Sequence, residues 1–529
     1  MEAPNYPLAR SHPDPWPDRW TYPLLCVLLV VYLLVGGVYV MLTPPWQVPD
    51  EPAHVNYARF VARTGRLPVL QMGDYDAAYL EALKANRFPP TMSVTSVRYE
   101  AHQPPLYYLL AAVGLRLFAP GALVPEPPYE DMVRAMYVMR WFSLILSVAT
   151  LGVVFLFMRN VFPRHPSWAL AAVAAVGFLP QHVAMMAGAN NDALAELGLV
   201  LWLWLLARRL LGYTSPGGVG LGLVLGAMLL TKTTVYLPAA LSLVAWTLIR
   251  GLPLPERTPW KDVLRQVGGI VVVALLVALP FYARNVRVYG WPDVLGLQRH
   301  AEVVVGQMTT KMYIAQYGWQ AYWERAITWT FRSFWGQFGW MGVLMDARVY
   351  RGLLYFTAIC LGAMGYFLWR SFQDRHGRWL RGGTPHYRTL SPVQHNILAM
   401  LSASALGTLL SYVGYNLSFL QHQGRYLFTA LLPLVALVLP GLWLFLAPRA
   451  ALRWGVGCLT VAVGVGLAAV LDWGPFTRWD GLMIAGLAVW FLAASRWPRW
   501  RPVWLMLPWV ALAPLSFWVM WRFILPALT

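Results

Sequence analysis

Charge is the scarcest property of this sequence, since only 12% of its 529 residues are Asp, Glu, Lys or Arg. Soluble domains carry about 25% charged residues, so neither a disordered chain nor an ordinary soluble enzyme is expected. Hydrophobic residues instead make up 58% of the chain. This composition indicates a polytopic membrane protein, in which each span uses about 20 apolar residues.

Cysteine and the common catalytic motifs are also scarce. The three cysteines, Cys26, Cys360 and Cys458, each lie inside an apolar run, so they form neither a disulfide framework nor a zinc-binding pattern. The sequence has no P-loop, HExxH, CxxC or nucleophile-elbow motif. The glycine-rich stretch 217–222 lies in an apolar run, where it favours close helix packing. The reaction classes that these motifs serve are therefore not indicated.

Apolar runs long enough to cross a bilayer are frequent. The first, residues 22–42, has no basic leader or small-residue cleavage pattern, which predicts an uncleaved helix. The others lie near 135–158, 167–187, 192–207, 217–231, 234–249, 266–283, 349–369, 393–419, 427–447, 454–471, 481–495 and 503–521. We predict an all-α polytopic membrane protein with about thirteen transmembrane helices. The shorter run 106–119 is predicted to be an interfacial helix.

The distribution of basic residues predicts the orientation of these helices. Alternate connections contain most of the basic residues, while the opposite short loops contain little beyond Lys232, Arg425 and Arg478. The basic connections contain Arg10, Arg19, Arg159, Arg164, Arg208, Arg209, Arg250, Arg257, Lys261, Arg265, Arg370, Arg375, Arg378, Arg381, Arg388, Arg449, Arg453, Arg496, Arg499 and Arg501. By the positive-inside rule they face the cytoplasm. We predict a multi-pass protein of the plasma (inner) membrane with a cytoplasmic N-terminus and an extracytoplasmic C-terminus. Because membrane topology accounts for the net charge of +18, no nucleic acid partner is expected.

This layout divides the chain into three parts. Residues 1–21 form a cytoplasmic segment, 22–447 a transmembrane catalytic module and 448–529 the C-terminal transmembrane helices. The module has two long outward loops, at about 43–134 and 284–348, which are too long to be simple connectors. We predict interfacial helices in them and expect the chemistry where they meet the membrane surface.

The first outward loop contains Asp50, Glu51 and His54 at the start of a predicted helix. Pro52 suits the first turn of that helix, and Gly65 suits its end. A carboxylate held above the bilayer can take a proton from an acceptor hydroxyl. In the alternative interpretation, Asp50 only caps the helix and Glu51 complements its dipole.

The next motif of interest contains His102, Gln103 and Tyr107, and paired prolines lead it into the short interfacial helix. Tyrosines suit the headgroup zone of a membrane. His102 is a candidate for contact with a phosphate or a sugar. The alternative for His102 is an interfacial histidine that bonds only to solvent.

A third motif, after the third span, contains Asn191, Asp192 and Glu196. Asp192 and Glu196 are four residues apart and share one helix face, with Glu196 about 6 Å further along the axis. Acidic residues at such a depth usually face a cavity. Helix capping explains the asparagine and Asp192, but it does not explain Glu196.

Two cations lie on the side that the positive-inside rule leaves poor in basic residues. Lys232 occupies a very short outward turn, where it pairs with a phosphate or extends to the surface. Arg425 lies between His422 and Tyr426, after a glycine that permits close backbone approach. A guanidinium binds phosphate with two donors. The alternative is an Arg425 that stacks on Tyr426 or pairs with a carboxylate.

Three motifs taken in order resemble those of the GT-C class of integral-membrane glycosyltransferases. They are Pro49-Asp50-Glu51-Pro52-Ala53-His54, Gln103-Pro104-Pro105-Leu106-Tyr107-Tyr108 and Gln423-Gly424-Arg425-Tyr426. The class includes aminoarabinose transferases and protein O-mannosyltransferases. More narrowly, the combination is similar to an uncharacterised family of predicted bacterial membrane proteins that is assigned to the class by similarity. The resemblance spans roughly residues 20–450.

The resemblance implies transfer of a sugar from a polyprenyl-phosphate donor to a lipid, glycan or protein acceptor at the outer face, usually with inversion. The class places its general base in the first outward loop, at Asp50 or the adjacent Glu51, and a second acidic site at Asp192. Aminoarabinose transferases carry lysine before the paired prolines, whereas this chain has His102-Gln103, so phosphate binding is expected to pass to Arg425 and Lys232. No cofactor is certain. Some class members need a divalent metal, for which Asp50 and Asp192 would be the ligands.

Two other functions are compatible with the sequence. A transporter or flippase of lipid-linked sugars would show repeats and polar residues near the bilayer midplane, whereas the polar groups here are concentrated at the outward ends of the spans. A membrane anchor without chemistry would leave the outward carboxylates without a purpose. Convergence of Asp50, Asp192 and Arg425 on one cavity favours the enzyme.

Overall fold

The computed structural model describes residues 16–213, 217–251, 259–380 and 390–529, in which every regular element is a helix apart from one two-stranded hairpin. The first elements are η1 (Asp18–Trp20), α1 (Thr21–Leu42), α2 (Glu51–Thr64), α3 (Ala77–Ala85), η2 (Tyr99–His102), α4 (Leu106–Phe118), η3 (Pro120–Leu123) and α5 (Tyr129–Val161). There follow α6 (Pro166–Gly177), α7 (Pro180–Met186), α8 (Asp192–Leu210), α9 (Gly218–Leu229), η4 (Thr233–Val235), α10 (Tyr236–Gly251), α11 (Trp260–Tyr289), α12 (Leu297–Val303) and α13 (Thr310–Trp335). The remaining elements are β1 (Gln337–Phe338), β2 (Val343–Leu344), α14 (Ala347–Leu380), α15 (Pro392–Ser418), η5 (Gly424–Ala430), α16 (Leu431–Phe445), α17 (Pro448–Val470), α18 (Arg478–Arg496), η6 (Pro498–Trp500), α19 (Arg501–Val510), α20 (Leu512–Val519), η7 (Met520–Ile524) and α21 (Leu525–Leu528).

Nine segments of the described chain are long and apolar enough to cross a membrane, and the pair α6–α7, bent by 69°, would make a tenth. The nine are Asp18–Leu42, Tyr129–Val161, Thr233–Gly251, Trp260–Tyr289, Ala347–Gln373, Pro392–Ser418, Gly424–Phe445, Pro448–Val470 and Pro498–Leu528. The all-α polytopic architecture agrees with the prediction, but the count of thirteen is not confirmed. Three predicted spans form helices that are too short or too polar to count, namely α8, α9 and α18.

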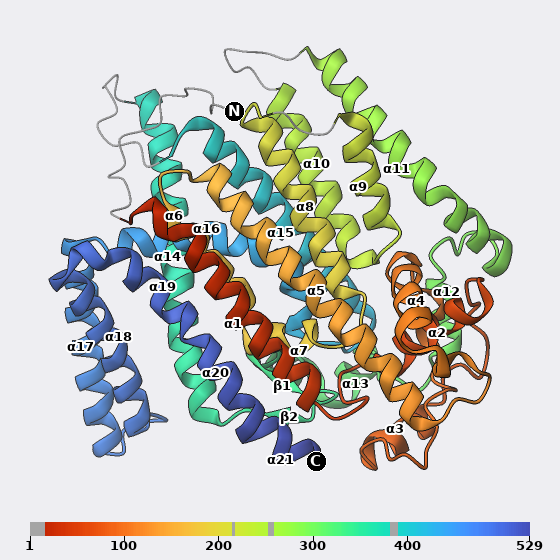
Figure 1. Cartoon of the computed structure of the whole chain (residues 1–529). Coiled ribbons are helices and arrows are strands. Elements are labelled where there is room, and N and C mark those ends of the chain that lie inside the picture. Colours follow the sequence, from red (N-terminus) through yellow and green to blue (C-terminus); the bar gives the residue numbers. More distant parts are fainter. Residues whose placement is uncertain (1–15, 214–216, 252–258, 381–389) are drawn as a thin grey trace.

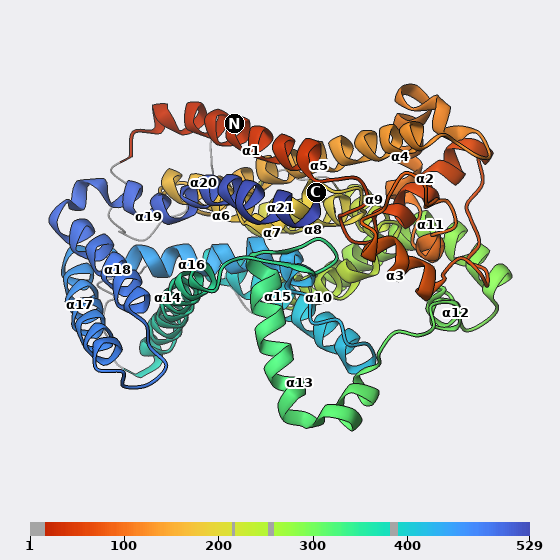
Figure 2. The same ribbon diagram turned by 90° about the horizontal axis from the view of Figure 1, so that it is seen from below.

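The two segments predicted to be outward loops lie at the same end of the molecule. Figure 1 shows α2, α3, α4 and α12 together at the lower right, with α13 and the short β1–β2 hairpin at the lower centre. Seen from that end, α13 projects away from the other helices (Figure 2). The orientation of this end relative to a membrane stays a prediction. Most of the cytoplasmic segment 1–21, together with Arg257, Arg381 and Arg388, lies outside the described residues.

Helix α2 has the predicted bounds. It runs from Glu51 to Thr64 with a proline in its first turn, and Gly65 ends it in the left-handed conformation at φ 67°. Asp50 precedes the helix, also with a positive φ of 68°, and its side chain makes no capping hydrogen bond. The capping interpretation of Asp50 is therefore wrong, and its carboxylate is free to bond elsewhere.

Close helix packing explains the glycine-rich stretch at the start of α9. A Cβ atom added to Gly222 would lie 2.5 Å from the Cβ atom of Val273 on α11, which is closer than real contacts allow. The last span also packs on the first part of the chain. The Tyr39 hydroxyl donates to the Ser516 carbonyl at 2.8 Å, and the Ser516 hydroxyl donates to the Phe178 carbonyl at 3.0 Å. The predicted boundary at residue 447 stays a prediction.

Candidate functional site

A cavity of about 300 Å³ lies at the end of the molecule where the two long segments meet. Its walls come from the turn before α2, from η2, from α12 and α13, and from the loop that leads into η5. The titratable groups that line it include Asp50, Glu100, His300, Arg325, His422 and Arg425. Residues far apart in the sequence thus form one polar pocket.

Asp50 and Arg425 meet directly across this cavity. The Nη2 atom of Arg425 lies 2.9 Å from Oδ2 of Asp50, and the Tyr99 hydroxyl donates to Oδ1 at 2.8 Å. The Asp50 side chain is 26% exposed and that of Arg425 8%, so the pair is shielded but the carboxylate still reaches solvent. Arg425 also stacks on Tyr426, at 5.3 Å from the ring centroid. Both parts of the alternative interpretation of Arg425 are therefore present.

Close packing of the loop against α13 fixes the position of Arg425. A Cβ atom on Gly424 would lie 2.4 Å from the main-chain nitrogen of Phe334 and 2.4 Å from the oxygen of Thr330. The Gly424 N–H donates to the Ser333 hydroxyl at 2.6 Å. The close approach expected of this glycine is confirmed, and it places Arg425 beside Asp50.

The ion pair determines the protonation of Asp50. Burial alone would raise the pKa of Asp50, but the charge of Arg425 and the hydrogen bonds from Arg425 and Tyr99 lower that pKa from 3.8 to about 2. The carboxylate is therefore ionised at every physiological pH. While Arg425 holds it, however, it is a weak base.

A second ion pair lies on the other side of Arg425. The Lys232 ammonium donates to Oδ1 of Asp192 at 2.7 Å, so Lys232 neither extends to the surface nor stands alone. Asp192, Glu196, Arg425 and Tyr426 line a small hollow of about 10 Å³, which is room for about one water molecule. Arg425 thus lies between the Asp50 cavity and the Asp192 hollow.

Glu196 has a buried partner that the sequence analysis does not identify. The His182 imidazole on α7 lies 3.0 Å from Oε2 of Glu196, and both side chains are almost fully buried. Glu196 also lines the small hollow beside Asp192, and its role in substrate binding stays a prediction.

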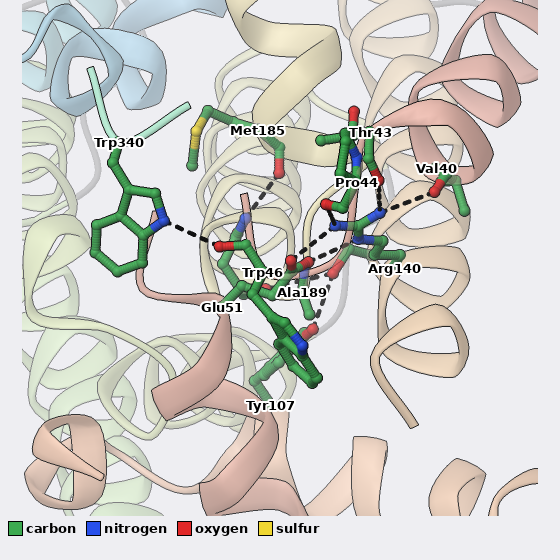
Figure 3. Close-up of polar contacts among 12 residues, drawn as sticks. Val40, Thr43, Pro44, Trp46, Glu51, Tyr107, Arg140, Met185, Ala189 and Trp340 are labelled. Carbon is green, nitrogen blue, oxygen red and sulfur yellow. Dashed lines mark hydrogen bonds and ion pairs between the residues drawn. The ribbon is translucent and has the colours of Figure 1, made fainter. Parts of the chain in front are cut away.

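Glu51 does not line the cavity. Its side chain binds Arg140 of α5 (Figure 3). The Nε and Nη2 atoms of Arg140 donate to the two Glu51 oxygens at 2.7 and 2.8 Å. The other N–H groups of Arg140 donate to the main-chain oxygens of Val40, Thr43 and Pro44, at the end of α1. All five donors of the guanidinium are thus used, and both side chains are fully buried.

This arrangement gives Glu51 a structural position. Its Oε1 atom also accepts the N–H of Ala189 at 3.1 Å, which ties the turn before α8 to the start of α2. Of the two adjacent acidic residues considered for a general base, only Asp50 reaches the cavity. We therefore assign no proton transfer to Glu51.

Replacing Glu51 by Gln is expected to destabilise the protein severely. The change leaves Arg140 as an uncompensated buried cation, and breaking a buried ion pair costs about 3–5 kcal/mol. Thermal unfolding of the purified protein in detergent measures the effect. The control is Glu324→Gln, because Glu324 is exposed and accepts one hydrogen bond, from Gln320. Equal unfolding temperatures for the two variants would contradict this role of Glu51.

Four other predicted substrate-binding residues lie behind the cavity wall. His54 is hydrogen-bonded to the Tyr108 hydroxyl at 2.7 Å, and the Tyr107 hydroxyl is hydrogen-bonded to Ser143 at 2.8 Å. The Asn191 amide donates to Oε1 of Gln103 at 3.5 Å. These residues support the loops that carry Asp50 and Asp192, and within the described chain none of the four lines the cavity.

His102 also lies outside the cavity and joins the two long segments. Its ring packs at 4.5 Å from that of His300 on α12. Burial and the neighbouring His300 lower the pKa of His102 to about 3, and burial lowers the pKa of His300 as well. The solvent-bonded alternative for His102 does not hold, because its ring is buried and neutral.

Acid is expected to weaken this histidine contact. The unfolded chain, whose histidine pKa is near 6.5, binds protons between pH 6.5 and 3 that the folded chain does not. Stability that is complete above about pH 6.5 is therefore lost as the pH falls, by about 2 kcal/mol at pH 5 for His102. Unfolding temperatures at pH 7, 6 and 5 test this. His102→Gln should flatten the dependence, and an unchanged slope would count against it.

Sequence reasoning does not identify three residues around the site. Glu100 lines the cavity with a buried Oε2 atom that has no hydrogen-bond partner, and the available signal was its position two residues before His102. The available signal for Arg140 was its position as a charged residue inside the apolar run 135–158. Arg325 had no such signal, because its neighbours match an ordinary interfacial helix.

The carboxylates do not form a metal site in the described part of the chain. No group of three or more His, Cys, Asp or Glu side chains is placed there to hold an ion. Asp50 and Asp192 are each paired with a cation, Arg425 and Lys232 respectively. A divalent metal at either carboxylate would have to displace that cation, so this donor set does not fit a resident metal.

A sequence model of one family matches part of the chain. The family is described as dolichyl-phosphate-mannose-protein mannosyltransferase, and the match covers residues 131–283, from α5 into α11. It includes Asp192 and Lys232 but neither Asp50 nor Arg425. This match, over less than a third of the chain, supports the resemblance to the GT-C class of membrane glycosyltransferases.

The solved structures that the chain resembles include two membrane enzymes. ArnT from Cupriavidus metallidurans, bound to undecaprenyl phosphate, is 16% identical with a TM-score of 0.47, over 97% of this chain and 77% of that chain. The apo oligosaccharyltransferase of Archaeoglobus fulgidus is 12% identical with a TM-score of 0.46, over 94% of this chain and 56% of that chain. Both likenesses are weak, and neither assigns a role to any residue here. No curated protein sequence matches the chain significantly.

Proposed function

We propose that the protein transfers a sugar from a polyprenyl-phosphate donor to a hydroxyl group of a lipid, glycan or protein acceptor at the outer face of the plasma membrane. The observation that carries this proposal is the pairing of Asp50 with Arg425 across the cavity. A transferase of this kind needs a base for the acceptor and a cation for the departing phosphate. Both groups are present within one pocket.

In the proposed reaction the acceptor oxygen attacks the anomeric carbon of the donor sugar. The bond from that carbon to the phosphate oxygen breaks, and the polyprenyl phosphate leaves with the electron pair. Asp50 takes the proton of the acceptor hydroxyl as the new bond forms. A single displacement of this kind inverts the anomeric centre. Arg425 stabilises the charge that builds on the phosphate, with two donors in a fork geometry.

Donor binding is what turns Asp50 into an effective base in this mechanism. The phosphate competes with Asp50 for the Arg425 guanidinium, and a carboxylate that loses its cation in a buried position becomes more basic. The resting ion pair therefore keeps Asp50 ionised until a donor arrives. Lys232 and Asp192, on the other side of Arg425, form the second pair beside the departing phosphate.

Replacing Asp50 by Asn is expected to reduce transfer at least about 100-fold, which is the usual contribution of a general base. The assay incubates the protein in lipid vesicles with polyprenyl-phosphate sugars and a cell-envelope acceptor extract, and it measures the release of polyprenyl phosphate. Glu324→Gln serves as the control with unchanged activity.

Other outcomes of this assay assign the chemistry differently. Activity that survives in Asp50→Asn but is lost in Glu100→Gln would move the base to Glu100, the other carboxylate that lines the cavity. A wild-type protein that moves lipid-linked sugar between leaflets without transferring it would favour the transporter.

Replacing Arg425 by Gln is expected to change the pH profile as well as the rate. In the wild type Asp50 is deprotonated above about pH 4, because its pKa is about 2, so kcat/KM should be flat from there to neutral pH. Without the guanidinium, burial raises the pKa of Asp50, and the acid limb should move to higher pH. A profile of kcat/KM from pH 4 to 8 measures this. If the acid limb of the kcat/KM profile is not shifted in the variant, Arg425 does not control the pKa of Asp50.

A further inference from the structure

The cavity continues into a wider hollow beside α13. This hollow has a volume of about 550 Å³ and shares several lining residues with the cavity, among them Tyr75, Lys84, Arg325 and Gln421. The two spaces therefore form one cleft that runs from Asp50 past Arg325. Such a cleft is longer than one sugar ring requires and leaves room for an extended acceptor.

The cations that line the cleft differ in whether a carboxylate pairs with them. Arg425 is paired with Asp50, and Lys84 is paired with Glu81 at 2.7 Å. In the described chain Arg325 has no carboxylate within 4.0 Å. Its guanidinium lies 3.8 Å from the centroid of the Trp329 ring, and its buried Nε atom has no hydrogen-bond partner. Arg325 is thus a cation that packs on aromatic rings and has no anionic partner in the described residues.

His422 lies beside Arg325 and also lacks partners. The residue is only 3% exposed, and both ring nitrogens are buried without a hydrogen bond. Its one close contact of note is the edge of the Tyr322 ring, at 5.0 Å between centroids. Burial and the charge of Arg325 lower the pKa of His422 to about 4, so the imidazole is neutral and keeps one N–H donor. Leaving a buried polar group without a partner is unfavourable, and a ligand that bonds to the imidazole would remove that cost.

We propose that Arg325 and His422 form a subsite for an anionic group, a carboxylate or a phosphate, on the acceptor. The acceptor class is then an acidic saccharide, whose charged group docks at this subsite while a hydroxyl group lies at Asp50. The rings of Trp329 and Trp340 also line the cavity, where Arg325 and Lys84 lie over them. This inference rests on the proposed function, since Arg425 is assigned there to the donor phosphate and leaves Arg325 for the acceptor.

The test is a binding measurement that needs no donor. Calorimetry with the full-length protein in nanodiscs compares tri-galacturonate with its methyl ester, and glucose 6-phosphate with glucose. The acid forms should bind at least about tenfold more tightly than the neutral forms, since a hydrogen bond to a charged group contributes about 1.5–3 kcal/mol. The first pair of ligands reports on a carboxylate and the second on a phosphate.

Three variants locate the binding. Arg325→Gln and His422→Gln should each remove most of the preference for the acid forms, and Arg325→Lys should restore part of it. The matched control is Arg332→Gln on the same helix, whose guanidinium lies over Tyr350 and not in the cavity. Unfolding temperatures check that each variant is folded.

The outcomes separate this inference from the proposed function. Equal binding of acid and neutral ligands by the wild type, or a preference that Arg325→Gln does not reduce, overturns the subsite even if transfer is observed. A preference that depends on Arg325 and persists in Asp50→Asn supports the subsite, including the case in which no transfer is detected and the proposed function fails.

Discussion

The buried pair of Glu51 and Arg140 is the interaction on which the site depends. Arg140 donates hydrogen bonds to main-chain carbonyls at the C-terminal end of α1 and to Glu51, the first residue of α2. Glu51 in turn accepts a hydrogen bond from the turn before α8. Because Glu51 turns inward, the preceding Asp50 turns outward, in a left-handed conformation that leaves its carboxylate free of the helix end. Two adjacent acidic residues thus have opposite roles, one in the scaffold and one in the cavity.

The charged residues at the site form two neighbouring ion pairs. Asp50 with Arg425 and Asp192 with Lys232 lie on either side of the same guanidinium. Neutral pairs cost less to bury than single charges, so they can be held in a shielded pocket without a metal ion. In the proposed mechanism a donor phosphate changes this balance, because it offers Arg425 a second anion beside Asp50.

Local signals predicted the local features well. Pro52 and Gly65 gave the bounds of α2, and Gly424 gave the close approach of the loop to α13. The different fates of Asp50 and Glu51 had no local signal, because both precede or begin the same helix and only their distant partners differ. The count of thirteen spans is not confirmed for a related reason. Hydropathy does not give the length of a helix, and α9 is shorter than the apolar run 217–231 that predicted it.

Gly424 also has a mechanical consequence. Its backbone lies so close to α13 that the two cannot move independently, and the N–H bond to Ser333 fastens them together. Arg425 follows this glycine directly, and Arg325 lies on α13 two turns before Ser333. The two guanidinium groups therefore belong to one rigid body, and any tilt of α13 that adjusts one must also adjust the other. The distance between the two ends of the cleft is therefore set by the fold before any ligand binds.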